Sequence, residues 1–386
     1  MAGTGCDRQE QRRGRCVHQR VGGDMAKKRV QRGFTLVELL VGLTVGLITL
    51  LVLTQLLQSF EGQKRTSTGG NDAQTNGAFA LYMLDREIRM AGYGVFGPES
   101  MLCRNGINMY YDDPAGGATV ANAASFVPIR IIDGGGSAPD SVLTMRSDAE
   151  FGAVPTSVIK DMPNPSSIIT ASTPGGLEVG DLFVMASKDG SKVCTLMQLT
   201  HDPQATGVGI NLQHNPGSSG PYNPSNPSNV FAKAESYVIG DIVINMGNYP
   251  RRQYSVECDQ LVESDPLVVA APDCDNSRPL VAQIVNLQAQ YGIAPVGSSA
   301  VNEWVDATGA WVNLLGDDIS RVRAIRLAVV ARNPQYEKDA ADTGTPDELE
   351  MWTGGPTIDI AEAERHYRYR VYETIIPLRN IIWSPS

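Results

Sequence analysis

The apolar side chains in the first hundred residues of this chain follow two different patterns. Residues 34–60 form an almost unbroken apolar stretch whose only charged residue is Glu38. Because about 20 apolar residues suffice to cross a bilayer as a helix, this stretch predicts a membrane-spanning helix. Within residues 61–92, Leu81, Leu84 and Ile88 are three and four positions apart, which predicts that an amphipathic helix follows.

A weak point for helix lies between these two segments. Residues 66–71 read Thr-Ser-Thr-Gly-Gly-Asn. A glycine in a helix interior costs about 1 kcal/mol relative to alanine. The sequence therefore predicts that the helix kinks or melts there.

Residues 93–386 show a third pattern, in which short alternating or β-branched runs are separated by turn-rich stretches. The runs occupy residues 126–132, 141–145, 182–186, 193–199, 236–245, 319–331 and 367–377. Residues 278–291 are the exception, because the spacing of their apolar side chains fits a short helix. We therefore predict an α+β fold, with one long N-terminal helix followed by antiparallel β-sheets with long loops, in one globular domain or two lobes.

Charge is distributed unevenly along the chain. Residues 1–33 carry nine Lys or Arg against three Asp or Glu, a net charge of +6, whereas residues 34–386 carry a net charge of −16. Basic residues before a membrane span stay in the cytoplasm, so residues 93–386 are expected to face the periplasm. The acidic remainder disfavours nucleic acid as a primary ligand, because phosphate binding needs clustered Lys and Arg.

The cysteine count agrees with export. Cys6 and Cys16 precede the apolar stretch, and four cysteines follow it: Cys103, Cys194, Cys258 and Cys274. An even number in an oxidising compartment predicts two disulfides, although four cysteines allow three pairings. We favour Cys258 with Cys274, which closes a short loop, and Cys103 with Cys194. A zinc site is the rival, but the sequence has no Cys-x-x-Cys pair and its four histidines are scattered.

Motifs for catalysis or cofactor binding are weak in this sequence. Residues 92–97 match the Gly-x-Gly-x-x-Gly spacing of dinucleotide sites, but they end a predicted helix instead of following a strand, so we interpret them as a helix C-cap. Neither a Gly-x-Ser-x-Gly elbow nor a P-loop occurs. Acidic loops such as 273–276 offer oxygen ligands for Ca²⁺, yet solvated turns explain them as well. We predict no catalytic residue, no cofactor and no metal site.

The block Gly33-Phe34-Thr35-Leu36-Val37-Glu38 resembles the class III signal of type IV pilins and type II secretion pseudopilins. The resemblance implies that a prepilin peptidase cuts after Gly33 and methylates Phe34. It also implies that Glu38 meets the free amine of a neighbouring subunit during assembly. Residues 1–33 are then a leader that carries no fold information. Family leaders are short, so we expect Met25 to be the true start and residues 1–24 a mis-assigned extension.

Two glycines in the apolar stretch, Gly42 and Gly46, form a Gly-x-x-x-Gly pair. Such a pair lets helices approach closely, which suits packing between subunits. The alternative is that small residues are simply common in membrane helices, and the sequence does not separate the two.

Three further segments resemble the PilW family of minor pilins: residues 84–93, residues 285–292, and the end of the last predicted strand at Leu378-Arg379-Asn380. The resemblance implies a pilin-like fold and a role in initiating pilus assembly, at or near the tip of a pilus that serves motility or adhesion. It implies as partners the prepilin peptidase, the other minor pilins, the major pilin, the inner-membrane assembly platform and a tip adhesin. The chain would be a single-pass inner-membrane protein before assembly and part of the cell-surface pilus afterwards.

Two alternatives to this function stay open. A minor pseudopilin of type II secretion uses the same leader and assembly helix. A membrane-anchored periplasmic enzyme or binding protein is the alternative from another class, and it requires converging polar residues that the sequence does not reveal. We therefore predict a structural protein and not an enzyme.

Overall fold

A computed structural model describes residues 33–94, 103–113, 116–149, 154–217, 220–248, 250–269, 271–314, 317–338 and 340–382. The chain divides into two compact units, residues 1–61 and residues 62–386. The leader proposed above lies outside the described residues except for Gly33.

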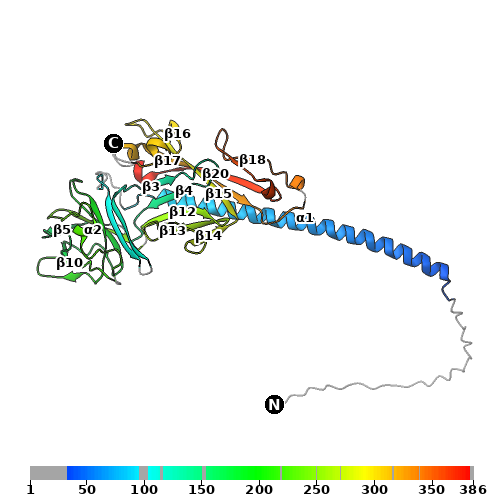
Figure 1. Ribbon diagram of the computed structural model, residues 1–386, viewed down its shortest axis with the longest axis horizontal. Coiled ribbons are helices and arrows are strands. Elements are labelled where there is room, and N and C mark those ends of the chain that lie inside the picture. Colours follow the sequence, from blue (N-terminus) through cyan, green and yellow to red (C-terminus); the bar gives the residue numbers. More distant parts are fainter. Residues whose placement is uncertain are drawn as a thin grey trace, which may run out of the picture. The chain divides into compact units, whose positions relative to one another are not determined.

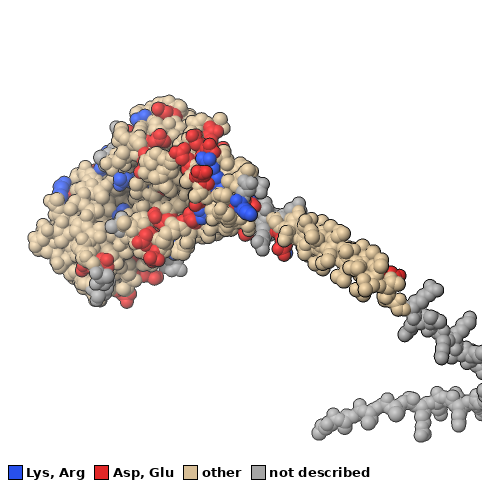
Figure 2. Space-filling view, turned by 45° about the vertical axis from the view of Figure 1, so that its right-hand side comes forward, with Lys and Arg blue, Asp and Glu red and all other residues tan. Residues whose placement is uncertain are grey.

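The first unit contains the N-terminal part of helix α1 (Leu36–Met90) (Figure 1). Within the described residues, the segment Leu36–Gly62 is the one helical stretch long and apolar enough to cross a membrane. Its apolar side chains are exposed to the surroundings, and Figure 2 shows this part of the helix as a surface almost free of charge. Helical backbone also continues through residues 66–71, so the predicted melting does not occur there.

The second unit contains four β-sheets. In spatial order, the strands of the nine-stranded sheet are β2 (Gly117–Ala124), β1 (Ile107–Asp113), β8 (Cys194–Gln198), β7 (Leu182–Ala186), β11 (Ile242–Gly247), β5 (Thr156–Lys160), β6 (Ile169–Ala171), β10 (Ile210–Leu212) and β9 (Gln204–Ala205). The five-stranded sheet consists of β14 (Arg278–Ala282), β13 (Gln260–Ser264), β12 (Arg251–Glu257), β4 (Ser141–Met145) and β3 (Ile129–Ile132). The four-stranded sheet consists of β16 (Glu303–Val305), β15 (Ile284–Ile293), β17 (Val322–Arg332) and β20 (Tyr369–Pro377).

The remaining elements are short. They are the hairpin of β18 (Glu348–Glu350) and β19 (Thr357–Asp359), the helices α2 (Pro227–Val230), α3 (Asp317–Arg321) and α4 (Arg379–Ile382), and the 3-10 turns Gly309–Trp311, Ala340–Asp342 and Glu362–Glu364. Neighbouring strands are antiparallel in every described sheet except for the parallel pair β1 and β8. The predicted α+β fold of one long helix and antiparallel sheets is confirmed.

The prediction of a short helix over residues 278–291 is wrong. This segment forms strand β14 and most of strand β15. Eight of the ten residues in β15 are buried, and apolar side chains such as Leu287 and Tyr291 alternate along it with polar side chains such as Asn286 and Gln288. This period of two is that of a strand, and it decided the structure over the three- and four-residue spacing. The predicted runs 141–145 and 182–186 coincide with β4 and β7.

The second half of α1 packs on the sheets of its own unit. Ala80, Leu84 and Ile88 are fully buried in one core cluster with Leu287 of β15 and Leu327 of β17. Leu84 and Ile88 belong to the three- and four-residue repeat seen in the sequence, and its other member, Leu81, is partly buried against the same cluster, because that spacing places side chains on one face of a helix. A nearby C-cap also behaves as predicted, since Gly92 has a positive φ and donates its N–H to the carbonyl of Met145 at 2.7 Å.

A second feature of the C-terminal end of α1 is a cap supplied from the other end of the chain. The side-chain amide of Asn380 donates to the carbonyls of Arg89, Met90 and Ala91 at 3.4, 3.3 and 3.0 Å. The last carbonyls of a helix have no partner within the helix, so an amide at this place satisfies them. This contact gives a physical reason for the asparagine that ends the Leu-Arg-Asn segment.

Gly77 marks the closest approach of α1 to strand β20. A Cβ atom added at Gly77 would lie 2.2 Å from Cε2 of Tyr372, whereas one added at Gly70 would meet no atom within 4 Å. Overpacking costs about 1–3 kcal/mol, and replacing a helical glycine by alanine otherwise gains about 1 kcal/mol. Urea unfolding of the full chain in detergent should therefore show that Gly70→Ala stabilises by about 1 kcal/mol and that Gly77→Ala does not stabilise or destabilises by up to about 2 kcal/mol. Equal gains from both substitutions would contradict the close contact.

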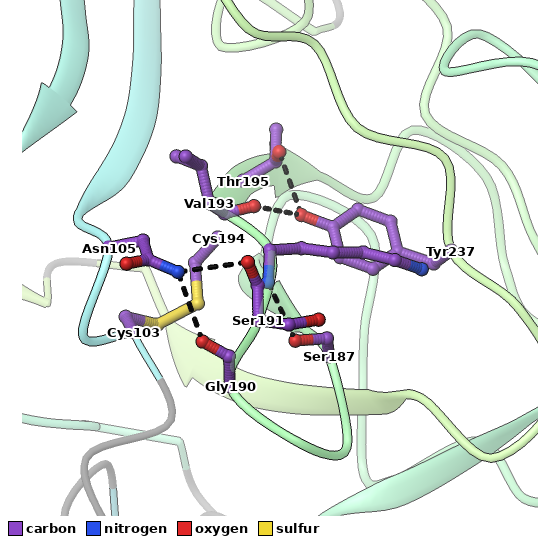
Figure 3. The surroundings of a disulfide bond; sticks show 10 residues. Cys103, Asn105, Ser187, Gly190, Ser191, Val193, Cys194, Thr195 and Tyr237 are labelled. Carbon is purple, nitrogen blue, oxygen red and sulfur yellow. Dashed lines mark hydrogen bonds between the residues drawn. A yellow bond between two sulfur atoms is a disulfide. The ribbon is translucent and has the colours of Figure 1, made fainter.

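Both favoured disulfide pairings are present, Cys103–Cys194 and Cys258–Cys274. The first joins the segment before β1 to the start of β8. The side-chain amide of Asn105 holds the loop before β8 by donating hydrogen bonds to the carbonyls of Gly190 and Ser191 (Figure 3). Next to the disulfide, the hydroxyl of Tyr237 donates to the backbone carbonyl of Val193 at 2.9 Å. In the chain-entropy model, closing loops of 16 and 91 residues stabilises by about 3 and about 4.6 kcal/mol.

Candidate assembly site at the start of the helix

The candidate site begins where extended backbone becomes helix. Gly33, Phe34 and Thr35 precede the first residue of α1, Leu36. The side chain of Phe34 is 86% exposed, and a Cβ atom added at Gly33 would meet nothing within 4 Å. No described part of the chain therefore covers the Gly33–Phe34 peptide bond. A cleavage site has to be accessible to the peptidase in this way.

Glu38 and Thr35 form a capping box at the start of α1. The N–H of Thr35 donates to Oε2 of Glu38 at 3.0 Å, and the N–H of Glu38 donates to Oγ1 of Thr35 at 3.2 Å. The hydroxyl of Thr35 also lies 3.0 Å from the same carboxylate oxygen, to which it donates. These contacts satisfy two of the N–H groups that a helix start leaves unpaired, and they hold the carboxylate beside the positive end of the helix dipole.

One carboxylate oxygen of Glu38 remains available for another group. Within the described residues, the hydrogen bonds of the Glu38 side chain are all made by Oε2, and Glu38 is exposed. A cation that approaches Oε1 would therefore not need to break the cap. The role of Thr35 was not predicted from the sequence, although the spacing Thr-x-x-Glu is itself a capping-box signal.

Gly42 and Gly46 lie one turn apart in the exposed apolar half of α1, and a Cβ atom at either position would meet nothing within 4 Å. The glycines therefore leave a shallow, small-residue face on this helix, which a second helix can approach. Their role in packing between subunits stays a prediction.

The threonines of the apolar half satisfy their own hydroxyl groups. Thr44, Thr49 and Thr54 donate to the carbonyls of Val41, Val45 and Leu51 at 2.8–2.9 Å. In hydrocarbon an unpaired hydroxyl is costly, so these bonds make the three polar residues compatible with a membrane span.

A second set of charged residues holds the other half of α1 to the globular unit. Oε2 of Glu87, which is buried, accepts from Nε of Arg146 at 3.1 Å and from Nη1 of Arg252 at 3.4 Å. Arg252 also contacts Asp148 at 3.0 Å. Burial alone would lower the pKa of Arg252, but Glu87 and the other nearby carboxylates raise it above its ordinary value. The arginine is therefore charged, and the network is a partly buried ion cluster around the buried carboxylate of Glu87.

Two family models match the chain. Residues 28–54 match the prokaryotic N-terminal methylation motif, and residues 253–380 match the family described as Type IV Pilus-assembly protein W. The resemblance to the PilW family is thereby confirmed. The PilW region contains β15, β17 and β20 together with the capping residue Asn380, and the methylation motif contains the candidate site at Glu38. No curated protein and no solved structure matches the chain.

The methylation motif implies processing by a prepilin peptidase and a place in pilus assembly. The apolar helix that follows it agrees with an inner-membrane protein that later enters a pilus. Within the described residues, no group of three or more His, Cys, Asp or Glu side chains is placed to hold a metal ion. The polar residues that do converge, around Glu87, are paired with one another inside the core.

Proposed function

We propose that this chain is a minor pilin of the type IV pilus that takes part in initiating pilus assembly and lies at or near the tip. The proposal is carried by one observation. A methylation motif with an available carboxylate in the first helical turn is followed by an exposed apolar helix, and the same chain carries a PilW region. The role is structural and not enzymatic.

The assembly step is electrostatic. Cleavage after Gly33 leaves a charged amine on Phe34, and a neighbouring subunit's amine can pair with Oε1 of Glu38 while Oε2 keeps the helix cap. In the low dielectric of lipid, opposite charges attract far more strongly than in water. The partners are therefore other pilin subunits, namely the other minor pilins and the major pilin, brought together at the inner-membrane platform and topped by a tip adhesin.

The second half of α1 offers a further surface for subunit packing. Its exposed large apolar side chains are Phe79, Tyr82 and Met90. They fall on the face opposite the buried Leu84 and Ile88, as the 100° step per residue requires. A helix of a lone soluble domain would carry polar residues on that face.

Replacing Glu38 by glutamine removes the negative charge but keeps the helix cap, because a glutamine at this position still completes a capping box. The substitution therefore tests the charge alone. We expect Glu38→Gln to be cleaved normally and to reach the membrane, but to be lost from sheared pili. The measurement is an immunoblot of membrane and pilus fractions, with Thr35→Ser as the matched control that keeps the cap. Wild-type amounts of Glu38→Gln in pili would show that the charge has no role in assembly.

A strain that lacks this gene separates the two pilin-like functions. A minor pilin of the type IV pilus predicts loss of surface pili and of twitching motility or adhesion with secretion intact. A minor pseudopilin predicts the opposite pattern, with normal piliation and failed protein secretion. The PilW region favours the first.

A further inference from the structure

Strand β20 is an open edge of the four-stranded sheet. It pairs with β17 over nine residues, and no strand of the described part of the chain pairs with its other side. Most residues of β17 are buried, whereas Arg370, Glu373 and Ile375 of β20 are exposed. Natural proteins usually shorten, bulge or interrupt such an edge, because its free N–H and C=O groups can pair with another strand. β20 has no bulge, and its one proline is its last residue.

The direction of the free backbone groups follows from the register. The N–H of Leu378 donates to the backbone carbonyl of Arg323 at 2.9 Å, and the N–H of Asn333 donates to the backbone carbonyl of Arg368 at 2.8 Å. Because bonded residues alternate along an antiparallel pair, the even-numbered residues of β20 bond to β17. The odd-numbered residues, from Tyr369 to Ile375, therefore direct their N–H and C=O groups away from the sheet.

A polar pocket of about 440 Å³ lies at the start of this edge, lined by α1 residues such as Gln74 and by Asn333, Arg368 and Arg370. Asn333 is 1% exposed, and its Nδ2 has no hydrogen-bond partner among the described residues, although its Oδ1 accepts from Gln335. A buried donor without a partner is costly. An acceptor from a ligand would satisfy it. Arg368 already contacts the carboxylate of Glu337 at 3.6 Å, so the exposed guanidinium of Arg370 is the group that favours a carboxylate here.

A second hollow of about 340 Å³ lies farther along the same strand, lined by Arg326, Trp352, Thr353, Glu373, Thr374 and Ile375. Ile375 is 51% exposed there, and the guanidinium of Arg326 stacks between Trp352 and Trp304 at 5.6 and 4.4 Å from the ring centroids. This hollow suits an apolar side chain. It lies on the opposite face of the sheet from the polar pocket, because Tyr372 points to α1 and the odd-numbered side chains of β20 point the other way.

We propose that the free edge of β20 binds an extended acidic segment of a partner protein, which adds a fifth strand to the sheet. Its backbone bonds to the odd-numbered residues of β20, one carboxylate enters the polar pocket, and one apolar side chain enters the hollow beside Trp352. The pockets are about five residues apart along β20, or roughly 17 Å, and they lie on opposite faces. Side chains of a strand alternate between faces, so the carboxylate and the apolar side chain are five positions apart in the partner segment. The site does not depend on cleavage or on Glu38.

The charge distribution indicates that an acidic segment binds at the start of β20 and not elsewhere on the surface. Residues 34–386 carry a net charge of −16, so most of the surface repels an acidic segment. Figure 2 shows acidic side chains gathered in several patches on the visible face of the molecule. The exposed Arg370 makes the start of β20 an exception, whereas Arg368 is paired with Glu337, and the position of Arg370 fixes the direction and position of the added strand.

The test uses the processed full chain in detergent and fluorescent ten-residue peptides with blocked ends, built from alternating Thr and Val. One peptide carries Glu and Leu five positions apart, and a matched peptide carries Lys in place of Glu. We expect fluorescence anisotropy to show binding of the Glu peptide and at least about tenfold weaker binding of the Lys peptide. Two further peptides carry N-methyl groups on every second backbone nitrogen, one at the odd-numbered and one at the even-numbered positions. One of them should not bind and the other should bind almost as well as the unmodified peptide, because an added strand donates hydrogen bonds to β20 from alternate residues only.

Two protein variants complete the test. Glu373→Pro removes one outward N–H without breaking a bond to β17, and edge strands tolerate such a proline. It should abolish peptide binding, whereas Glu373→Thr should retain it. Absence of binding by the Glu peptide, equal binding of the two N-methylated peptides, or unchanged binding to a folded Glu373→Pro variant would overturn the proposal. A dimer of the wild-type chain that Glu373→Pro dissociates would assign the edge to a second copy and would also overturn it.

Discussion

Replacing Gly33 with valine should leave most of the chain uncleaved, with its leader attached and confined to the membrane. A side chain at this position cannot disturb the fold, because a Cβ atom there meets no described atom within 4 Å. The loss must then arise in the peptidase, whose site has to admit the residue before the cut bond. An immunoblot that resolves the precursor from the mature chain measures this.

Gly70→Ala is the control, because it also adds a side chain in open space but lies far from the cleavage site. This variant should be cleaved as completely as the wild type. Full processing of Gly33→Val would show that the methylation motif is not used in this chain.

Replacing Glu87 with alanine should destabilise the globular unit by about 3–5 kcal/mol, because it leaves two partly buried arginines without their buried carboxylate. Arg146 would lose its Glu87 contact, whereas Arg252 would keep Asp148 at 3.0 Å and Glu263 at 4.0 Å. We therefore expect a value near the lower end of the range. Urea unfolding of the full chain in detergent, followed by tryptophan fluorescence, provides the measurement.

The control for Glu87 is the neighbouring carboxylate on the same helix. Asp85 pairs with Arg89 at 2.7 Å one turn away, and both side chains are partly exposed. Exposed pairs of this kind contribute about 0.3–0.5 kcal/mol, so Asp85→Ala should have a small effect that salt weakens further. If the two substitutions destabilise equally, the network around Glu87 does not hold α1 in place.

The signal at the start of the chain was predictable because it is local. Gly33, Phe34 and Glu38 lie within six residues, and Thr35 and Glu38 form a capping box through contacts of the helix start itself. The short loop between Cys258 and Cys274 was predictable for the same reason. Strand β7 was found because its five residues are all apolar, and strand β4 because it is rich in apolar residues and short.

What the sequence did not reveal depends on distant partners. Strand β15 contains Asn286 and Gln288, whose amides donate to the carbonyls of Ser137 and Ala138 about 150 positions away, so they do not look like strand-core residues. The cap that Asn380 places on α1 joins residues 289–291 positions apart. Glu87 lies outside the apolar repeat of the amphipathic segment, and its burial was not predicted because its partners Arg146 and Arg252 come from distant parts of the chain.

The central claim is that the processed chain becomes part of a pilus. Mass spectrometry of sheared, purified pili tests it most directly, by a search for the peptide that begins at Phe34. The account predicts this peptide with a methylated amino terminus and in small amount relative to the major subunit. Pili that lack every peptide of the chain, from cells whose membranes contain it cleaved at Gly33-Phe34, would contradict the account.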